Sequence, residues 1–294
     1  MARRPKTRRA GLVFHAMKPR RNPLPQRATT RRMDAVLAEI EFLALSANRV
    51  DVLGLLADGP HTRHELATET GASQPTLGRI LRDFEERNWI APTEGGYEAT
   101  PTGRLVADGM REFYALMETE RTLRELVDWL PTEELSFDLR ELREATVTVP
   151  SQTRPGAPVS RVIELVRDAE SVTVLSHAFN DRTLEAVTEW VDSGGRFEAV
   201  FSADAIEPVA DDAVLADRFR RLVAADTATI RIYDGSVPLA VTLIDGTVSL
   251  LLRDDSGRLQ AALDTDSPAV ADWAGEVYDR YRRESRPLAA ELLD

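Results

Sequence analysis

The feature that most constrains the fold is an ordered series of two short helices and a hairpin between residues 63 and 99. The spacing predicts a helix from about Arg63 that ends at Gly71, and a second helix capped by Ser73 with Pro75 tolerated in its first turn. The second helix presents one apolar face, formed by Leu77, Ile80, Leu81 and Phe84. The following stretch, NWIAPTEGGYEATPTG, predicts two short strands joined by a Gly-Gly turn.

Two further helices are predicted before this series. The first begins near Asp34 and places Val36, Leu37, Ile40, Leu43 and Ala44 on one face. The second is capped by Ser46 and ends at Gly59-Pro60. Helices followed by a two-stranded wing, over residues 33–101, predict a winged helix-turn-helix domain.

The outward face of the helix that Ser73 caps is the candidate DNA-binding surface. Its N-terminus and Ser73 suit a phosphate, Gln74 and Thr76 suit base edges, and Arg79 suits phosphate or guanine. The full set of DNA-binding candidates, with the glycines of the wing, is Ser73, Gln74, Pro75, Thr76, Arg79, Arg82, Gly95 and Gly96.

The net charge of the chain, −12, opposes this function, because DNA is a polyanion. No Asp or Glu occurs between Thr70 and Arg82, however, so the predicted groove-facing turn is free of carboxylates. The basic residues include two lysines, Lys6 and Lys18, and 35 arginines, which with abundant Asp and Glu is typical of salt-loving archaea. At molar salt the screening length is about 3 Å, so the global charge hardly repels a duplex.

Residues 1–32 hold 11 basic residues and no acidic one, and their composition predicts a disordered arm. Two interpretations are open. The arm is a DNA-seeking segment, or it is inert and reflects a wrongly assigned start, since Met33 directly precedes the first predicted helix.

The connecting region, residues 102–158, is predicted to begin with a long helix. Val106, Met110, Phe113 and Met117 are spaced as in a heptad seam. This seam packs against its own domain, or it forms a homodimer that spans two half-sites on a double-stranded DNA operator.

Residues 159–294 alternate helix and strand and then form a hairpin around Asp245-Gly246, which predicts an α/β domain with a mixed sheet. Ligands of such sheets bind beyond the carboxyl ends of parallel strands. The candidates there for a small polar effector are Ser176, His177, Asn180, Ser202, Asp204 and Tyr233. In the alternative interpretation they are ordinary helix caps and turn residues.

The segment HELATETGASQPTLGRILRDFEERNWI resembles the winged helix-turn-helix regulators of bacteria and archaea over roughly 60 residues. Pro75 stands where those regulators usually have Ser, and Gly78 where they have a small polar residue. Together with WLPTEELSFDLRELREATVTV and the α/β domain, the chain resembles haloarchaeal transcriptional regulators with a methanogenesis-regulator-type middle domain. That domain is distantly phospholipase-D-like and related to archaeal sugar-sensing regulators. The resemblance implies an effector-sensing or oligomerising domain attached to a DNA reader.

Several functions are excluded by missing residue types. The chain has no Cys, so it lacks thiolate metal sites, and no carboxylate cluster completes a metal site at His61 and His64. No Lys follows Lys18, which excludes the His-x-Lys signature of phospholipase D, a Walker A loop and a Schiff-base cofactor site. No run approaches about 18 apolar residues, so no membrane span is expected and the protein is expected to be cytoplasmic.

The sequence therefore predicts an α+β, two-domain transcriptional regulator that is not an enzyme and needs no cofactor. Its winged helix contacts an operator and its α/β domain senses an effector. The alternative is a winged-helix scaffold or docking protein of the transcription machinery whose second domain only oligomerises it.

Overall fold

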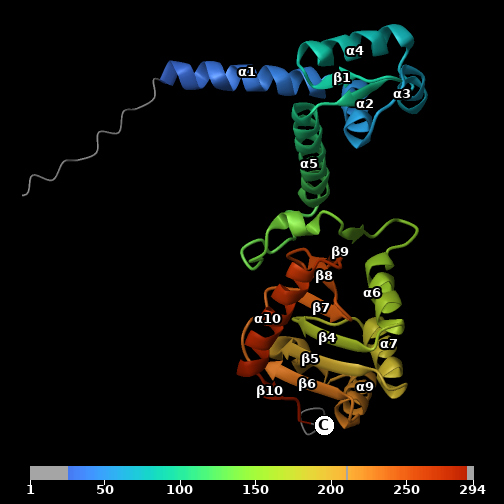
Figure 1. Cartoon of the computed structure of the whole chain (residues 1–294). Helices are drawn as coiled ribbons and strands as arrows, with labels where there is room; N and C mark the ends of the chain where they lie inside the picture. Colours follow the sequence, from blue (N-terminus) through green and yellow to red (C-terminus); the bar gives the residue numbers. More distant parts are fainter. Residues whose placement is uncertain (1–25, 210, 290–294) are drawn as a thin grey trace, which may run out of the picture. The chain divides into compact units, whose positions relative to one another are not determined.

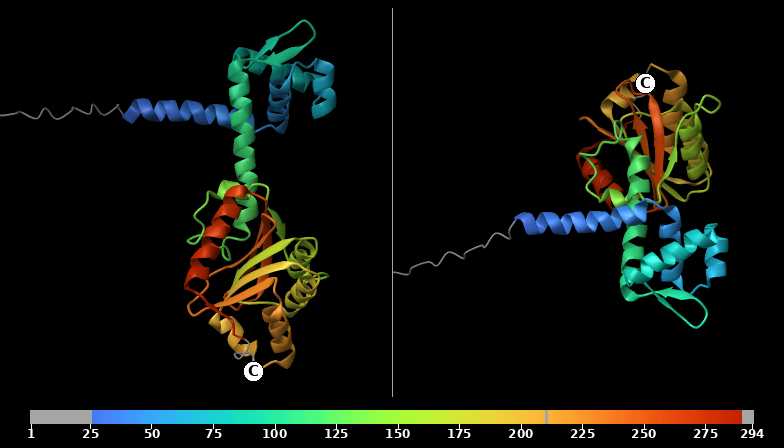
Figure 2. Two further views of the ribbon diagram at one scale, coloured as in Figure 1. Left: turned by 60° about the horizontal axis from the view of Figure 1, so that its bottom comes forward. Right: turned by 90° about the horizontal axis from the view of Figure 1, so that it is seen from above.

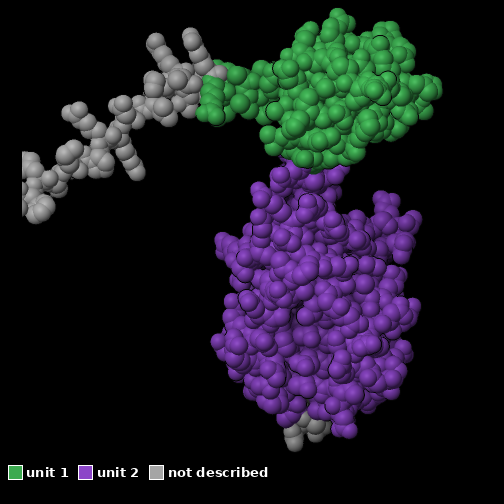
Figure 3. All heavy atoms as spheres, in the orientation of Figure 1, with its two compact units in different colours: residues 1–111 green, residues 112–294 purple. Residues whose placement is uncertain are grey.

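A computed structural model of the chain describes residues 26–209 and 211–289, and its contacts separate two compact units, residues 1–111 and 112–294 (Figures 1 and 3). The boundary falls inside the predicted connecting region. The first unit is helical with a small hairpin, and the second holds a large mixed sheet. The two-domain α+β fold class is therefore confirmed. No helix within the described ranges has the length and apolar character needed to cross a bilayer.

The first unit follows the predicted order of elements. They are α1 (Gln26–Ala44), α2 (Ala47–Asp58), α3 (Arg63–Thr70), α4 (Gln74–Glu86), β1 (Ile90–Pro92), β2 (Tyr97–Ala99) and the first half of α5 (Pro101–Arg124). Helix α3 begins at a capping box, in which Thr62 and Glu65 each accept a hydrogen bond from the other's backbone N–H. It ends at Gly71, which adopts the left-handed conformation with φ of 67°.

The core of this unit lies where α2, α3 and α4 meet the wing. The apolar face of α4 is fully buried there, with Phe84 against Trp89 at a ring separation of 5.7 Å. Since the inward face of α4 is occupied in this way, its opposite face is available to a partner.

Helix α1 differs from the prediction in two respects. It begins at Gln26, so residues 26–32 are helical where a disordered arm was expected, because that stretch contains no Gly or Pro to stop a helix. The rest of the predicted arm, residues 1–25, lies outside the described residues. Of the predicted inward face, only Leu43 is buried. We use the name α1 stripe for Met33, Val36, Leu37 and Ile40, which are 41% to 58% exposed.

The second unit is built around one eight-stranded sheet with strand order β10-β6-β5-β4-β7-β8-β9-β3. The strands are β3 (Thr146–Thr148), β4 (Ser171–Ser176), β5 (Arg196–Ser202), β6 (Ala228–Tyr233), β7 (Ala240–Ile244), β8 (Thr247–Arg253), β9 (Leu259–Thr265) and β10 (Arg286–Pro287). Strands β4, β5 and β6 are parallel, and the others pair antiparallel. Asp245 and Gly246, both with positive φ, make the turn between β7 and β8, as the sequence predicts.

Helices cover both faces of this sheet (Figure 2). One face carries α6 (Ala157–Arg167), α7 (Asp181–Asp192) and α9 (Ala213–Ala224), and the other carries α10 (Pro268–Glu284). Short turns of helix complete the unit: η1 (Leu139–Leu142), α8 (Ala203–Ile206) and η2 (Glu207–Val209).

One end of the sheet positions the candidate ligand site. The carboxyl end of β4 lies beside the start of β7, with Leu175 opposite Val241, and the start of β7 pairs with the end of β8, with Ala240 opposite Leu251. Residues that follow β4 are therefore close to residues that end β8, although more than 70 positions separate them in the sequence.

Candidate functional site

The N-terminal turn of α4 is exposed, as a DNA-contacting surface requires. Ser73, Gln74, Pro75, Arg79 and Arg82 are exposed and Thr76 is half-buried. The Ser73 hydroxyl accepts a hydrogen bond from the Thr76 backbone N–H at 3.4 Å, and the two hydroxyl groups lie 2.9 Å apart. Ser73 thus caps the helix as predicted, whereas the side chains of Gln74 and Arg79 form no hydrogen bond or ion pair within the described residues.

Arg79 and Arg82 of this surface have no acidic partner in the described part of the chain. The ion pairs of the unit use other residues, among them Arg49 with Asp83 at 3.7 Å and Arg87 with Glu39 at 2.8 Å. Within the described ranges, no carboxylate lies within 4.0 Å of the Arg79 or Arg82 guanidinium. Their positive charge is therefore available to a phosphate.

Arg63 is a third arginine of this surface, and the sequence analysis missed it. A Cβ atom at Gly78 would lie 2.9 Å from a terminal nitrogen of Arg63, so the guanidinium lies against α4 at its one glycine. Arg63 is exposed and, in the part of the chain that the structure describes, forms no ion pair. The small residue at position 78 was the only signal in the sequence for this contact.

The wing is fixed by backbone contacts. His61 and Tyr97 exchange two backbone hydrogen bonds of 2.9 Å, which joins β2 to the segment before α3. A Cβ atom at Gly96 would lie 2.1 Å from the His61 carbonyl oxygen, so this position requires glycine. Gly95 faces open space at the tip beside the exposed Glu94. The structure therefore gives Gly96 a role in building the wing and leaves Gly95 free for contact.

His61 and His64 do not gather further ligands. The His61 Nδ1 atom is 2.9 Å from the Gly59 carbonyl oxygen, and its Nε2 atom is 3.8 Å from a Glu69 carboxylate oxygen. No group of three or more His, Asp or Glu side chains in the described part of the chain is arranged to hold a metal ion.

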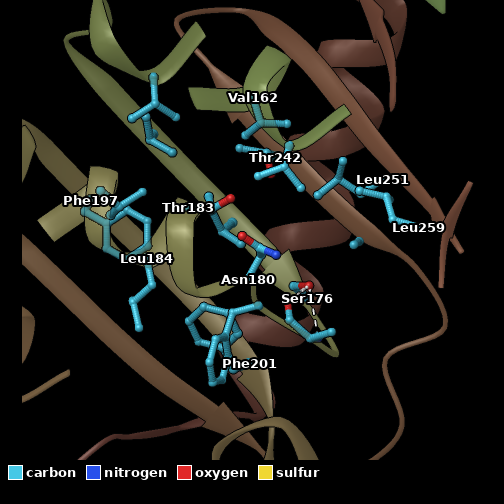
Figure 4. Close-up of a pocket in the computed structure, with 18 of the residues that line it drawn as sticks. Val162, Ser176, Asn180, Thr183, Leu184, Phe197, Phe201, Thr242, Leu251 and Leu259 are labelled. Carbon is cyan, nitrogen blue, oxygen red and sulfur yellow. Dashed lines mark hydrogen bonds between the residues drawn. The ribbon is translucent and has the colours of Figure 1, made fainter. Parts of the chain in front are cut away.

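In the second unit, three of the six predicted effector residues line a hollow and three do not. Ser176 and Asn180 line a cavity of about 60 Å³ between α6, α7 and the sheet (Figure 4). His177 lines an adjoining hollow of about 330 Å³. Ser176 donates a hydrogen bond to the Ala178 carbonyl oxygen at 2.6 Å, and Asn180 caps α7 by accepting one from Arg182. Asn180 thus caps α7 and Ser176 closes the turn after β4, and both residues also face the cavity.

Ser202, Asp204 and Tyr233 line neither hollow. Strand β5 runs directly into α8, which buries Ser202 and leaves its hydroxyl without a hydrogen-bond partner. Asp204 lies in the first turn of α8, and the Tyr233 ring packs edge-to-face on Tyr281 at 4.9 Å. The ends of β5 and β6 are therefore closed by helix and aromatic packing, and the open crevice lies at β4.

Arg253, at the end of β8, lines both hollows. It donates one hydrogen bond, from Nη1 to the Gly257 carbonyl oxygen at 2.9 Å, while its Nε is buried without a partner. Burial lowers the pKa of Arg253 from its usual value. Burial also lowers the pKa of His177, and the charge of Arg253 lowers it further, so the imidazole is neutral near pH 7.

Two family models match this chain. Residues 37–122 match the HVO_A0261 N-terminal domain, and residues 155–284 match the middle domain of the methanogenesis regulatory protein FilR1. Among curated proteins, 8-amino-8-demethylriboflavin N,N-dimethyltransferase from Streptomyces davaonensis is 28% identical over 134 residues, which are 42% of this chain. The chain spans only 39% of the length of that enzyme.

Solved structures that are similar to this chain match it at low identity. TrmBL2, an archaeal chromatin protein, is 16% identical over 81% of this chain and 92% of its own, with a TM-score of 0.39. Nuc, a phospholipase D family member from Salmonella typhimurium, is 15% identical over 49% of this chain and 99% of its own, with a TM-score of 0.40. Neither likeness is close enough to carry an argument about function.

Proposed function

We propose that this chain, whose two matched families together support a transcription regulator, binds double-stranded operator DNA through the outer face of α4. The observation that carries the proposal is the exposed face of α4 from Gln74 to Arg82, which has no carboxylate; Arg79 and Arg82 of this face, and Arg63 of α3 beside Gly78, have no acidic partner among the described residues. Unpaired guanidinium groups beside a helix N-terminus are suited to phosphate and guanine.

The distribution of charge on α4 explains how an acidic protein would bind DNA through this surface. The acidic residues of α4, Asp83, Glu85 and Glu86, are in its C-terminal half, and Asp83 is paired with Arg49. Repulsion between DNA and distant carboxylates is screened over about 10 Å at 0.1 M salt and over less at higher salt. Short-range contacts of the first turn, with Gln74 at a base edge and Arg79 on phosphate or guanine, then decide binding. The composition supports a haloarchaeal setting, in which such screening is strong.

We propose that the operator-bound form is a homodimer. Val106 and Met110 of the α5 seam pack on the first unit's own core, whereas Phe113, Tyr114 and Met117 are 40% to 48% exposed. The α1 stripe is a second apolar surface that the described residues leave exposed. Helices bearing such surfaces are typical of contacts between subunits. Light scattering on the full chain and on Met117→Glu tests this: we expect a dimer that the substitution weakens, and a wild-type monomer would refute it.

The alternative function is that of a docking protein, which the α1 stripe also favours because it presents apolar side chains to a protein partner. Mapping of bound DNA across the genome separates the two functions. A regulator gives discrete sites with a shared sequence, and Gln74→Ala changes the base preference at one position of that sequence. A docking protein gives sites that follow its partner and are indifferent to Gln74→Ala.

The α/β domain is proposed to sense a small effector and to alter operator affinity through the connecting helices. The crevice at the carboxyl end of β4 supports this role, since it holds Ser176, His177 and Asn180 beside a half-buried arginine. A domain that only oligomerises the chain would leave operator affinity unchanged when metabolites are added.

A further inference from the structure

Arg253 is a half-buried cation with no counter-ion among the residues that the structure describes. No carboxylate in the described ranges lies within 4.0 Å of its guanidinium, although other shielded arginines of this unit are paired, such as Arg161 with Asp264 at 2.8 Å. The adjacent Asp254 does not serve, because its oxygens accept hydrogen bonds within the turn that follows, from Ser256, Arg258 and Gln260. A charge withdrawn from water without a partner is costly, so this arrangement favours an anionic ligand.

The cavity beside Arg253 is apolar. Its walls come from α6, α7 and strands β4, β5, β7, β8 and β9, with side chains such as Val162, Leu184, Phe197 and Leu251 (Figure 4). Besides Arg253, the polar side chains of this lining are few: Ser176, Asn180, Thr183 and Thr242. A single water needs roughly 10–15 Å³, so the volume of about 60 Å³ admits a group of several heavy atoms. An apolar group is favoured there because water would find few hydrogen-bond partners.

The hollow on the other side of Arg253 supplies room for the entry of a ligand. Its volume is about 330 Å³, and its lining includes Trp129, His177 and Pro238. The Nδ1 atom of His177 is buried without a hydrogen-bond partner. An anion on Arg253 would offset the charge that lowers the pKa of this imidazole.

We propose that the second unit binds a small organic carboxylate with a short apolar chain, with the carboxylate on Arg253 and the chain in the cavity between α6, α7 and the sheet. The guanidinium of Arg253, which has no acidic partner among the described residues, borders this apolar cavity. An inorganic anion would pair with the guanidinium but leave the cavity empty, and an uncharged apolar molecule would fill the cavity but leave the guanidinium unpaired. This inference rests on the proposed function only in naming the class of effector, since the site itself involves no DNA.

Binding is tested on the full chain without DNA by titration calorimetry and thermal unfolding. The probes are hexanoate, octanoate, hexanol, which has the same chain without the charge, and inorganic phosphate. We expect hexanoate to bind and to raise the melting temperature, and hexanol and phosphate to bind much more weakly. Arg253→Gln should weaken hexanoate binding by about ten- to hundredfold, as expected for the loss of a charge-assisted hydrogen bond.

Arg258→Gln is the matched control, since Arg258 is an exposed arginine that lines neither hollow. Leu259→Ala tests the cavity independently of Arg253. Leu259 is half-buried in the cavity wall, and its truncation lengthens the cavity. This variant should shift the preference from hexanoate toward octanoate. If Arg253→Gln fails to fold, Leu259→Ala and the hexanol comparison decide the question.

The proposal is overturned if hexanol or phosphate binds as tightly as hexanoate, if no acid binds at millimolar concentration, or if Arg253→Gln and Arg258→Gln behave alike. It is also overturned if Leu259→Ala leaves the chain-length preference unchanged. Operator titrations with and without hexanoate keep the two proposals apart. Binding of hexanoate without any change in operator affinity supports the site and refutes its role as a sensor. If the wild-type chain binds no DNA with or without hexanoate, the proposed regulator function is refuted and the proposal of a carboxylate site is unaffected.

Discussion

Substitution of Arg79 in α4 should affect DNA affinity, and substitution of Arg87 at the C-cap of α4 should affect folding stability. Arg79 is exposed and, within the described residues, forms no ion pair, so Arg79→Ala removes no intramolecular contact of that kind. Arg87 follows the same helix but is engaged. Its Nε is 2.8 Å from a Glu39 carboxylate oxygen, its Nη1 donates to the Asp83 carbonyl oxygen at 3.0 Å, and its guanidinium lies 3.8 Å from the centre of the Phe42 ring.

The expected magnitudes follow from these contacts. Arg79→Ala should change the free energy of unfolding by less than about 0.5 kcal/mol, the usual range for an unengaged surface residue. If Arg79 contacts phosphate, the slope of log affinity against log salt should fall in magnitude by about 0.9. If it contacts guanine, specific binding should weaken by about 1–3 kcal/mol. Arg87→Ala should instead cost about 1 kcal/mol of stability, from an exposed ion pair and a cation–π contact, and should leave DNA affinity almost unchanged.

The assay pairs fluorescence-anisotropy titrations on a mapped operator, at several salt concentrations, with thermal unfolding of the same samples. Arg79→Ala should change the DNA affinity and not the melting temperature, and Arg87→Ala should change the melting temperature and not the DNA affinity. The reasoning is refuted if Arg79→Ala leaves both affinity and salt slope at wild-type values, or if the two substitutions weaken DNA binding equally.

Three further predictions concern the wing, a buried ion pair and a histidine. Gly96→Ala places a Cβ atom 2.1 Å from a backbone carbonyl oxygen and should lower the unfolding free energy by about 1–3 kcal/mol, whereas Gly95→Ala, which meets open space, should be nearly neutral in urea unfolding. Asp264 is 3% exposed and pairs with Arg161 at 2.8 Å, so Asp264→Asn should cost about 3 kcal/mol by the same measurement, and an unchanged midpoint would contradict it. The pKa of His177 lies below its usual 6.5 in the folded chain, so the unfolded chain takes up the proton first. Stability is therefore complete above about pH 6.5 and falls as the pH drops below it, and His177→Gln should flatten the melting temperature between about pH 5 and 7.

Much of the first unit could be predicted because its signals are local. The cap at Ser73, the left-handed glycine at position 71 and the apolar spacing of α4 act within one or two turns, and the structure bears out each of them. The same apolar periodicity gave a wrong prediction at α1, where most of the face predicted to be buried is exposed. An apolar face specifies that a helix is amphipathic, but it does not say whether the chain itself supplies the surface that covers it.

The candidate ligand site was found only in part, for a topological reason. Ser176 ends a parallel strand, and His177 and Asn180 follow it, which is a local pattern that sequence can show. Arg253 ends the second strand of an antiparallel hairpin, where nothing local marks it as part of a site. Ser202 and Tyr233 also end parallel strands, but α8 and Tyr281 close those positions.

By itself the sequence determined the order of the helices and wing in the first unit, the alternation of helix and strand in the second, the α4 surface without carboxylates and the absence of the chemistry that lysine and cysteine would provide. Those features depend on residue type and on contacts within a few positions. The tertiary structure alone decided that β7 pairs with β4, which brings Arg253 to His177, and that Arg63 lies against Gly78. Such contacts depend on strand order and on the packing of distant segments, because backbone hydrogen bonds between strands are the same for every sequence and only the assembled core selects which strands meet.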